Sequence, residues 1–175
     1  MVLHVVPNDP AWADAFAQEQ TALLAALPPG CLTLHHIGST SIPDILAKPI
    51  IDLLGATPDL AQIDALTETF ATLGYEALGT YGIEGRRYFR KHNDTGLRTH
   101  HLHIFQATSP HLTRHIAFRD YLRAHPEIAA KYSALKAQLT AAPNLTWSSY
   151  LDGKDPFIRR VETDALAWAQ QTQAR

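Results

Sequence analysis

The amino-acid sequence predicts an α+β fold, in which a mixed β-sheet is flanked by helices and the C-terminal part is helical. Short apolar or alternating runs between Gly, Pro, Asn and Asp predict strands, and apolar side chains spaced three and four residues apart predict helices. Helices separate some strands and short turns join others, which indicates parallel and antiparallel neighbours in one sheet. With 46% hydrophobic residues, a chain of 175 residues can bury one sizeable core. We therefore expect a single domain over residues 1–175, with a sheet region of about 1–108 and a helical tail of about 109–175.

Proline after a small polar or turn residue predicts the start of four helices, because proline fits the first helical turn. These starts are Asp9-Pro10, Thr57-Pro58, Ser109-Pro110 and Asp155-Pro156. Apolar side chains recur at helical spacing after these starts, and Gly74 is expected to end the second helix. A further helix is expected after His125, so that the C-terminal third is helical.

Five strands are expected between these helices. They cover residues 31–37, 49–54, 75–79, 86–92 and 97–106. In the last strand the side chains alternate clearly, with His101 and His103 on one face and Leu102 and Ile104 on the other. If the leucine and the isoleucine face the helices, the two histidines face a cleft.

The charge and hydropathy of the chain exclude several classes of partner. A formal net charge of -2 and a pI near 6.5 argue against binding long nucleic acid through its phosphates, but leave small anionic ligands open. No stretch approaches the ~20 apolar residues of a membrane span, and the N-terminus lacks the basic and apolar regions of a signal peptide. We therefore expect a cytoplasmic protein with no membrane partner. The sequence does not predict the oligomeric state.

A Gly-Ser turn lies between two apolar runs in HHIGSTSIPDILAKPIIDLL, residues 35–54. Backbone N–H groups at such a turn, with nearby hydroxyl groups and a lysine, suit a phosphate group. The residues concerned are Gly38, Ser39, Thr40, Ser41 and Lys48. The alternative is that the glycine only permits the turn and the hydroxyl groups cap a short helix. The turn alone does not decide between the two.

Asp52 interrupts the apolar run that follows this turn. A carboxylate inside an apolar strand costs several kcal/mol unless it is hydrogen-bonded, bound to a metal or placed at an open face. We therefore predict that Asp52 has a functional role, as the catalytic residue of the site.

Basic and aromatic side chains gather in the strand GRRYFRKH, residues 85–92. Guanidinium and ammonium groups beside an aromatic ring suit a phosphate and a stacked base. The candidate nucleotide-binding residues are Arg86, Tyr88 and Lys91, with Arg98 from the next strand and Lys154 from the helical part. A solvated basic edge strand and a solvated loop lysine are the alternatives.

The turn and the acid together resemble the nucleotidyltransferase (polymerase β-like) superfamily, in which a Gly-Ser pair precedes a short helix and an Asp-x-Asp strand. Leu54 stands where the second acid belongs. From residue 35 to about residue 158, five blocks resemble the GrpB family of small bacterial proteins in order and spacing. They are HHIGSTSIP with AKPIIDLL, GIEGRRYFRK, RTHHLHIF, FRDYLRAHPEIAAKYSALK and YLDGKDPFI. The resemblance implies a nucleotidyltransferase-like fold and a nucleotide-linked role. Members fused to dephospho-coenzyme A kinase suggest a link to coenzyme A metabolism.

The same resemblance implies a metal site. In the superfamily, carboxylates from two neighbouring strands hold the divalent ions that activate the attacking oxygen. Here His101 or His103 would take the place of an acid from the later strand, so that Asp52 and two imidazoles hold Mg, Mn or Zn. A site with two histidines and one carboxylate favours Zn, Mn or Fe over Mg. Alternatively, the histidines hydrogen-bond a phosphate without a metal, or pair within the sheet.

Three functions follow from these residues. The first is metal-dependent transfer of a nucleotidyl group from a nucleoside triphosphate to an unknown acceptor. The second is a module that binds a nucleotide or coenzyme A without catalysis, because the second acid is missing at Leu54. The third is a His-rich, metal-dependent phosphoester hydrolase.

Overall fold

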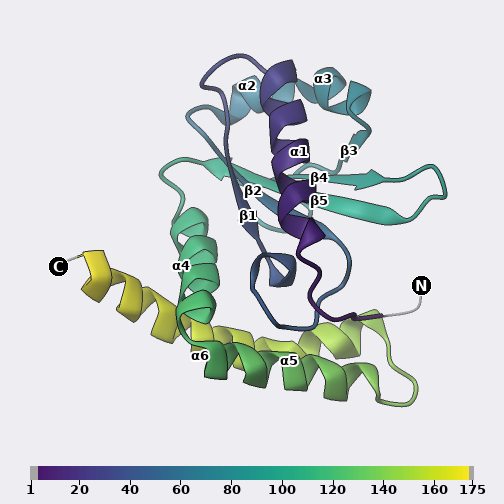
Figure 1. Ribbon diagram of the computed structural model, residues 1–175. Helices are drawn as coiled ribbons and strands as arrows, with labels where there is room; N and C mark the ends of the chain where they lie inside the picture. The colour runs from purple at the N-terminus through teal and green to yellow at the C-terminus, as the bar shows by residue number, and fades with distance from the viewer. Residues whose placement is uncertain (1–3, 174–175) are drawn as a thin grey trace.

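The computed structural model describes residues 4–173 and contains one five-stranded sheet (Figure 1). The strand order is β1-β2-β5-β4-β3. Neighbours pair antiparallel except β2 and β5, which pair parallel. The strands are β1 (Thr33–Ile37), β2 (Ile51–Thr57), β3 (Tyr75–Ala77), β4 (Arg87–His92) and β5 (Arg98–Gln106). The predicted mixed sheet and its five strands are confirmed.

Helices cover the sheet and form a separate C-terminal layer. They are α1 (Ala11–Ala26), α2 (Leu60–Ala65), α3 (Thr67–Thr72), α4 (Pro110–Ala124), α5 (Pro126–Thr140) and α6 (Trp147–Gln173). Figure 1 shows α4, α5 and α6 together on one side of the sheet, with α5 and α6 running alongside each other. The α+β class with a helical C-terminal part is therefore confirmed. None of the described helices combines enough length with enough apolar character to cross a membrane.

Alternation along the strands places two different cores on the two faces of the sheet. On one face Leu102 and Ile104 pack with residues of α1, α2 and α3, including Leu23, Ile63 and Phe70. On the other face a second apolar cluster consists of Ile37, Leu54, Phe105 and Leu112. The leucine and isoleucine of β5 thus face the helices, as predicted, and His101 and His103 face the other way.

Two predicted helix starts are wrong. The last helix begins at Trp147, and Pro156 lies inside it. Thr146 caps this helix, since its Oγ1 accepts a hydrogen bond from the Ser149 N–H at 3.0 Å. The second predicted helix begins at Leu60, because Asp59 provides the cap by accepting from the Ala61 N–H at 2.8 Å. The start at Ser109-Pro110 is confirmed by the Ser109 cap.

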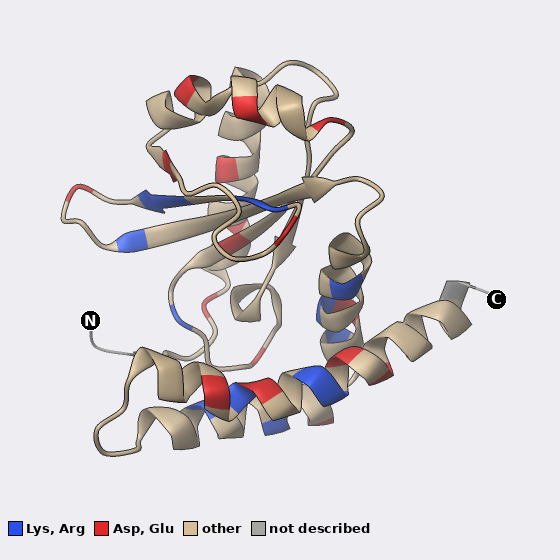
Figure 2. Ribbon diagram, turned by 180° about the vertical axis from the view of Figure 1, so that it is seen from behind, with Lys and Arg blue, Asp and Glu red and all other residues tan. Residues whose placement is uncertain are grey.

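Charges of both signs are interspersed on the C-terminal helices, as Figure 2 shows from behind. On this side Lys and Arg alternate with Asp and Glu, so that no stripe of a single sign is visible. Ion pairs between helices contribute to this pattern, including the one between Arg114 of α4 and Glu162 of α6.

Candidate functional site

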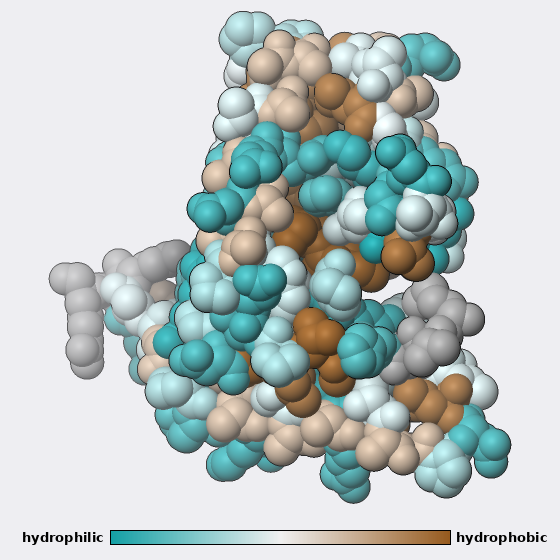
Figure 3. All heavy atoms as spheres, turned by 45° about the vertical axis from the view of Figure 1, so that its right-hand side comes forward, coloured by the Kyte–Doolittle hydropathy of each residue, from teal (hydrophilic) through white to brown (hydrophobic). Residues whose placement is uncertain are grey.

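A cavity of about 240 Å³ lies between the sheet and the pair α5 and α6. Its walls come from the Gly-Ser turn, the segment before β2, β2 itself, β5 and both helices. The lining residues are Ser39, Thr40, Lys48, Ile50, Asp52, Arg98, His101, His103, Lys136, Trp147, Tyr150 and Lys154. In Figure 3, apolar side chains lie among hydrophilic ones at the level where the sheet meets the helical layer. We refer to this cavity as the inner pocket.

The Gly-Ser turn holds its shape through backbone and hydroxyl hydrogen bonds. Gly38 has a φ of 71°, and residues Ser39–Ser41 form a short 3-10 helix. The Ser41 hydroxyl donates to the Gly38 carbonyl at 2.7 Å. A Cβ atom at position 38 would lie 2.3 Å from Asp52 Oδ2, so only glycine allows the turn to pass this carboxylate. Ser41 therefore stabilises the turn and does not line the inner pocket.

Asp52 and His101 face each other across the parallel strands β2 and β5. They are direct neighbours in the strand register, and Asp52 Oδ1 lies 3.0 Å from His101 Nδ1. Burial alone would raise the pKa of Asp52, but the hydrogen bond with His101 and the nearby histidines lower it below its usual value. The carboxylate is therefore ionised at neutral pH, with 28% of its side chain exposed.

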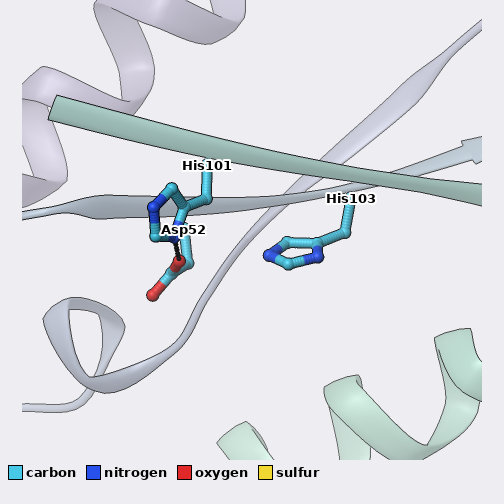
Figure 4. Close-up of side chains that lie close together, drawn as sticks. All are labelled: Asp52, His101 and His103. Carbon is cyan, nitrogen blue, oxygen red and sulfur yellow. Dashed lines mark hydrogen bonds and ion pairs between the residues drawn. The ribbon is translucent and has the colours of Figure 1, made fainter. Parts of the chain in front are cut away.

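Three side chains form a candidate metal centre (Figure 4). One ligand atom from each of Asp52, His101 and His103 lies within 4.8 Å of the others. His101 Nε2 is buried without a hydrogen-bond partner among the described residues. Burial lowers the pKa of His103 to about 4, so its imidazole is neutral and able to bind a metal. The donor set thus fits one divalent ion.

The side chain at the position of the missing second acid is fully buried. Leu54 has no exposed surface and packs with Ile37, Phe105 and Leu112. It lies on the same face of β2 as Asp52, two residues further along. The inner pocket therefore has one carboxylate among its lining residues, and an Asp-x-Asp pair is not available.

Lys136 of α5 reaches the Gly-Ser turn from the helical layer. Its Nζ donates to Ser39 Oγ at 2.9 Å and also to the Leu46 carbonyl. The lysine is 2% exposed, and burial, followed by the charge of Lys154, lowers its pKa to about 7. A buried ammonium group beside a second lysine is unfavourable unless an anion joins them.

Two aromatic rings of α6 hold further lysines over the inner pocket. Lys48 Nζ lies 3.6 Å from the centroid of the Trp147 ring, and Lys154 Nζ lies 4.3 Å from that of Tyr150. Burial, then the charges of Lys154 and Arg98, lower the pKa of Lys48 to about 8. Lys48 Nζ is buried without a hydrogen-bond partner among the described residues. Its cation–π contact leaves the donor capacity of this ammonium group unused.

The other predicted nucleotide-binding residues lie outside the inner pocket. Arg86 donates from Nε to the Thr80 carbonyl at 3.0 Å, and its Nη1 lies 3.4 Å from His103 Nδ1. The Tyr88 ring packs beside those of His101 and His103, at centroid distances of 5.7 and 5.0 Å. Both side chains therefore contact the histidines without lining the inner pocket.

The structure does not bring Lys91 to the site. Lys91 lies on the opposite face of the sheet, where its Nζ donates to both carboxylate oxygens of Glu19 at 2.9 and 3.0 Å. By contrast, Lys136, Trp147 and Tyr150 line the inner pocket although the sequence did not single them out. Lys136 lies four residues after Tyr132 and shares the buried face of α5, so this helical spacing is the local signal that could have found it.

Comparison with known proteins gives one family. A family model described as GrpB protein matches residues 2–164. YqkA of Bacillus subtilis, a UPF0157 protein, is 40% identical over 166 residues, which cover 95% of this chain and 48% of YqkA. The chain thus spans about half the length of this relative. A dephospho-CoA kinase of Mycolicibacterium paratuberculosis is 26% identical over 97% of this chain and 47% of its own length.

Solved structures support the same grouping. The crystal structure of the conserved protein GrpB from Enterococcus faecalis is 42% identical and has a TM-score of 0.89, covering 95% of this chain and 99% of that one. Cid1 poly(U) polymerase with bound Mg 3′-dATP has a TM-score of 0.54 at 17% identity, covering 85% of this chain and 49% of Cid1. The likeness to Cid1 is one of fold alone.

Proposed function

This chain belongs to the GrpB family and has a nucleotidyltransferase-like fold, and from this premise we propose that its inner pocket binds a nucleoside triphosphate together with one divalent ion. The pocket then transfers the nucleotidyl group to a small acceptor. The likeness to nucleotidyltransferases supports the fold, and the side chains of the pocket supply the argument for the reaction.

The excess of positive charge in the pocket carries the proposal. Lys48, Arg98, Lys136 and Lys154 line it together with a single carboxylate, Asp52. Four basic side chains against one carboxylate, in a partly buried site, disfavour one another's charged forms and are stabilised by a polyanion. A triphosphate carries several negative charges over a short length, which suits this arrangement.

Each part of the triphosphate has a plausible partner in the pocket. Lys136 and the hydroxyl group of Ser39, which are already hydrogen-bonded, suit the phosphate chain, with Thr40 beside them. The ring of Trp147, which is 46% exposed, offers a surface for the base beside Lys48. Asp52, His101 and His103 would hold the ion, which supplies charge neutralisation at the phosphates.

The reaction breaks the phosphoanhydride bond between the α- and β-phosphates and forms a bond from the α-phosphorus to the acceptor. An oxygen of the acceptor bonds to the α-phosphorus, the bond from that phosphorus to the bridging oxygen breaks, and pyrophosphate leaves. The protein positions the two reactants and stabilises the charge that moves to the leaving group. In this proposal Lys136 and Lys154 stabilise the leaving pyrophosphate.

Leu54 favours a second candidate function, a binding module without turnover. Because Leu54 is buried against Phe105 and Leu112, no second carboxylate is available for a second metal ion. The similar dephospho-CoA kinase gives coenzyme A as a further ligand to be tested in this case. Such a module would bind its ligand equally well with and without metal.

A thermal-shift titration against nucleoside triphosphates and coenzyme A, each with EDTA, Mg or Mn, tests both candidates. A ligand at ~100 times its dissociation constant adds about 2.7 kcal/mol, which corresponds to a rise in Tm of roughly 5–10 °C. A shift that requires metal and is lost in Asp52→Asn supports the transferase. A shift that is indifferent to metal supports the module. Bound transition metal without preference for triphosphates would instead indicate the phosphoester hydrolase, and no shift with any ligand would contradict all three.

A further inference from the structure

A second cavity, of about 280 Å³, adjoins the inner pocket. Three residues, Lys48, Ile50 and Arg98, line both cavities and form the boundary between them. The remaining walls come from the segment before α1, the segment before β2, the hairpin that joins β4 to β5, and β5 itself. These residues are His4, Pro49, Asn93, Leu97 and Thr99. We refer to this cavity as the outer pocket.

The outer pocket has an apolar wall that is open to solvent. Pro49, Ile50 and Leu97 contribute aliphatic surface, and Leu97 is 66% exposed, the most exposed large apolar side chain of the described chain. An exposed leucine alone needs no explanation, but here it borders a cavity next to a cationic site. The wall suits the apolar part of a small molecule.

The boundary between the pockets carries two polar atoms without partners. Lys48 Nζ and Arg98 Nε are both buried and make no hydrogen bond to the residues that the structure describes. In contrast, Lys136 Nζ already donates to Ser39 and Leu46. Because buried donors are unfavourable when unpaired, the boundary is suited to an oxygen of a ligand, and its two positive charges favour an oxyanion.

We propose that the outer pocket binds the acceptor, and that the acceptor is a small molecule with an apolar body and an oxyanion, either a carboxylate or a phosphate monoester. The apolar body lies against Leu97 and the oxyanion lies at Lys48 and Arg98, facing the inner pocket. This inference rests on the proposed function, because it assigns the second substrate of the same reaction.

An oxyanion acceptor also agrees with the single acid of the site. A hydroxyl acceptor must lose a proton as it attacks, which calls for a base or for further activation by metal. A carboxylate or phosphate oxygen is already ionised at neutral pH. It forms its bond to the α-phosphorus while pyrophosphate leaves, and no proton has to be removed. The loss of an acid at Leu54 is then compatible with turnover.

The test uses probes that share a body and differ in the reacting group. Hexanoate and hexyl phosphate are compared with hexanol, and with acetate and inorganic phosphate, which lack the apolar body. Binding of each probe is measured by calorimetry without triphosphate, and pyrophosphate release is measured with triphosphate and Mn. We expect hexanoate or hexyl phosphate to bind at least about tenfold more tightly than hexanol, acetate and inorganic phosphate, and to release pyrophosphate. The two anions also distinguish a carboxylate acceptor from a phosphate acceptor.

A matched pair of leucine variants locates the probe. Leu97→Asn should weaken binding of the favoured probe about fivefold and leave triphosphate binding unchanged. Leu24→Asn is the control, since Leu24 is also exposed, at 43%, but lies on α1. Both substitutions are at exposed positions, so folding should be preserved.

Several results would overturn the inference. Equal binding of hexanol and hexanoate would contradict recognition of an oxyanion. Equal binding of hexanoate and acetate would contradict a role for the apolar wall. Displacement of the probe by triphosphate would place both anions in the inner pocket. If triphosphate binds but none of the probes binds at millimolar concentration, the acceptor assignment alone is wrong. If triphosphate does not bind, the proposed function itself fails, and this outcome is distinguished by the separate titrations.

Discussion

The two faces of the central sheet carry the same types of charged side chain in different surroundings. On the face covered by α1, Glu19 accepts two hydrogen bonds from Lys91 and lies 3.8 Å from His100. On the opposite face Asp52 pairs with His101, but four basic side chains line the same pocket. On the first face an acid, a histidine and a lysine form a cluster whose charges balance. On the second face the same residue types belong to a pocket with an excess of basic side chains.

The difference teaches how to tell a structural charge cluster from a binding site. The Glu19 cluster satisfies its charges internally, so a ligand would gain little by entering it. The inner pocket leaves Lys48 Nζ and Arg98 Nε without partners among the described residues, and an anionic ligand would relieve that state. Residue type alone does not separate the two faces, whereas the balance of charge does.

The largest effect is expected from Asp52→Asn. The substitution keeps the shape of the side chain but removes the one carboxylate among the described residues that line the inner pocket. We expect metal-dependent binding of triphosphate to be lost and any transferase turnover to fall about a thousandfold. Calorimetry and pyrophosphate release measure these two quantities. Asp64→Asn is the control, because Asp64 is exposed and pairs with Arg87 outside the pocket. A variant at position 52 with unchanged metal dependence would contradict the assignment.

Glu19→Gln should lower the stability of the protein and leave triphosphate binding unchanged. The change leaves Lys91 and His100 without their acid in a largely buried cluster, in which Glu19 has a side-chain exposure of only 10%. We expect the free energy of unfolding to fall by about 3 kcal/mol, which lowers Tm by roughly 6–12 °C. Triphosphate binding by the folded variant should stay within about twofold of the original. Loss of binding in this variant would mean that the two faces are coupled.

Lys136→Met should weaken triphosphate binding about thirtyfold, because a charge-assisted hydrogen bond to phosphate is lost. The variant keeps the length of the buried side chain and removes its charge, so the apo protein should remain folded. Lys91→Met is the matched control on the other face, where the lysine binds Glu19. Isothermal titration of both variants separates the two lysines. Equal losses of affinity would show that net charge alone matters.

Much of this fold follows from sequence patterns. Alternation in β5 predicts that His101 and His103 share a face, and the parallel pairing of β2 with β5 then brings Asp52 beside them. The same alternation places Lys91 on the face of Phe89, which is in the core. A phosphate contact for Lys91 was therefore hard to reconcile with its strand face. The same alternation would put Arg98 on the face of Leu102, and the register shift between Lys91 and His92, which the pattern does not reveal, accompanies its place in the inner pocket.

The remaining parts of the site depend on tertiary packing. Lys136 reaches Ser39 only because α5 packs beside the Gly-Ser turn, which is 97 residues away along the chain. Trp147 and Tyr150 reach the inner pocket because α6 begins well before Pro156. A proline normally indicates the first turn of a helix, so the sequence favoured a shorter helix that would exclude both rings.

The smallest predicted effect concerns the pH dependence of stability, and it compares the protein with Lys136→Met. Lys136 has a pKa of about 7 in the folded protein, lowered by burial and by the charge of Lys154 from an ordinary value of 10.5. Between these two values the unfolded chain holds a proton that the folded protein has released, so the free energy of unfolding rises with pH. The contribution of this lysine is at most about 1.4 kcal/mol per pH unit, and it is constant below pH 7, where both states are protonated. Lys136→Met lacks it, so the variant should exceed the original protein in stability near pH 7, and the difference should shrink as the pH rises toward 10. Urea unfolding of both proteins at several pH values measures the difference. A gap that stays constant with pH would mean that Lys136 remains charged in the apo pocket, and that the pocket tolerates its cations without a bound anion.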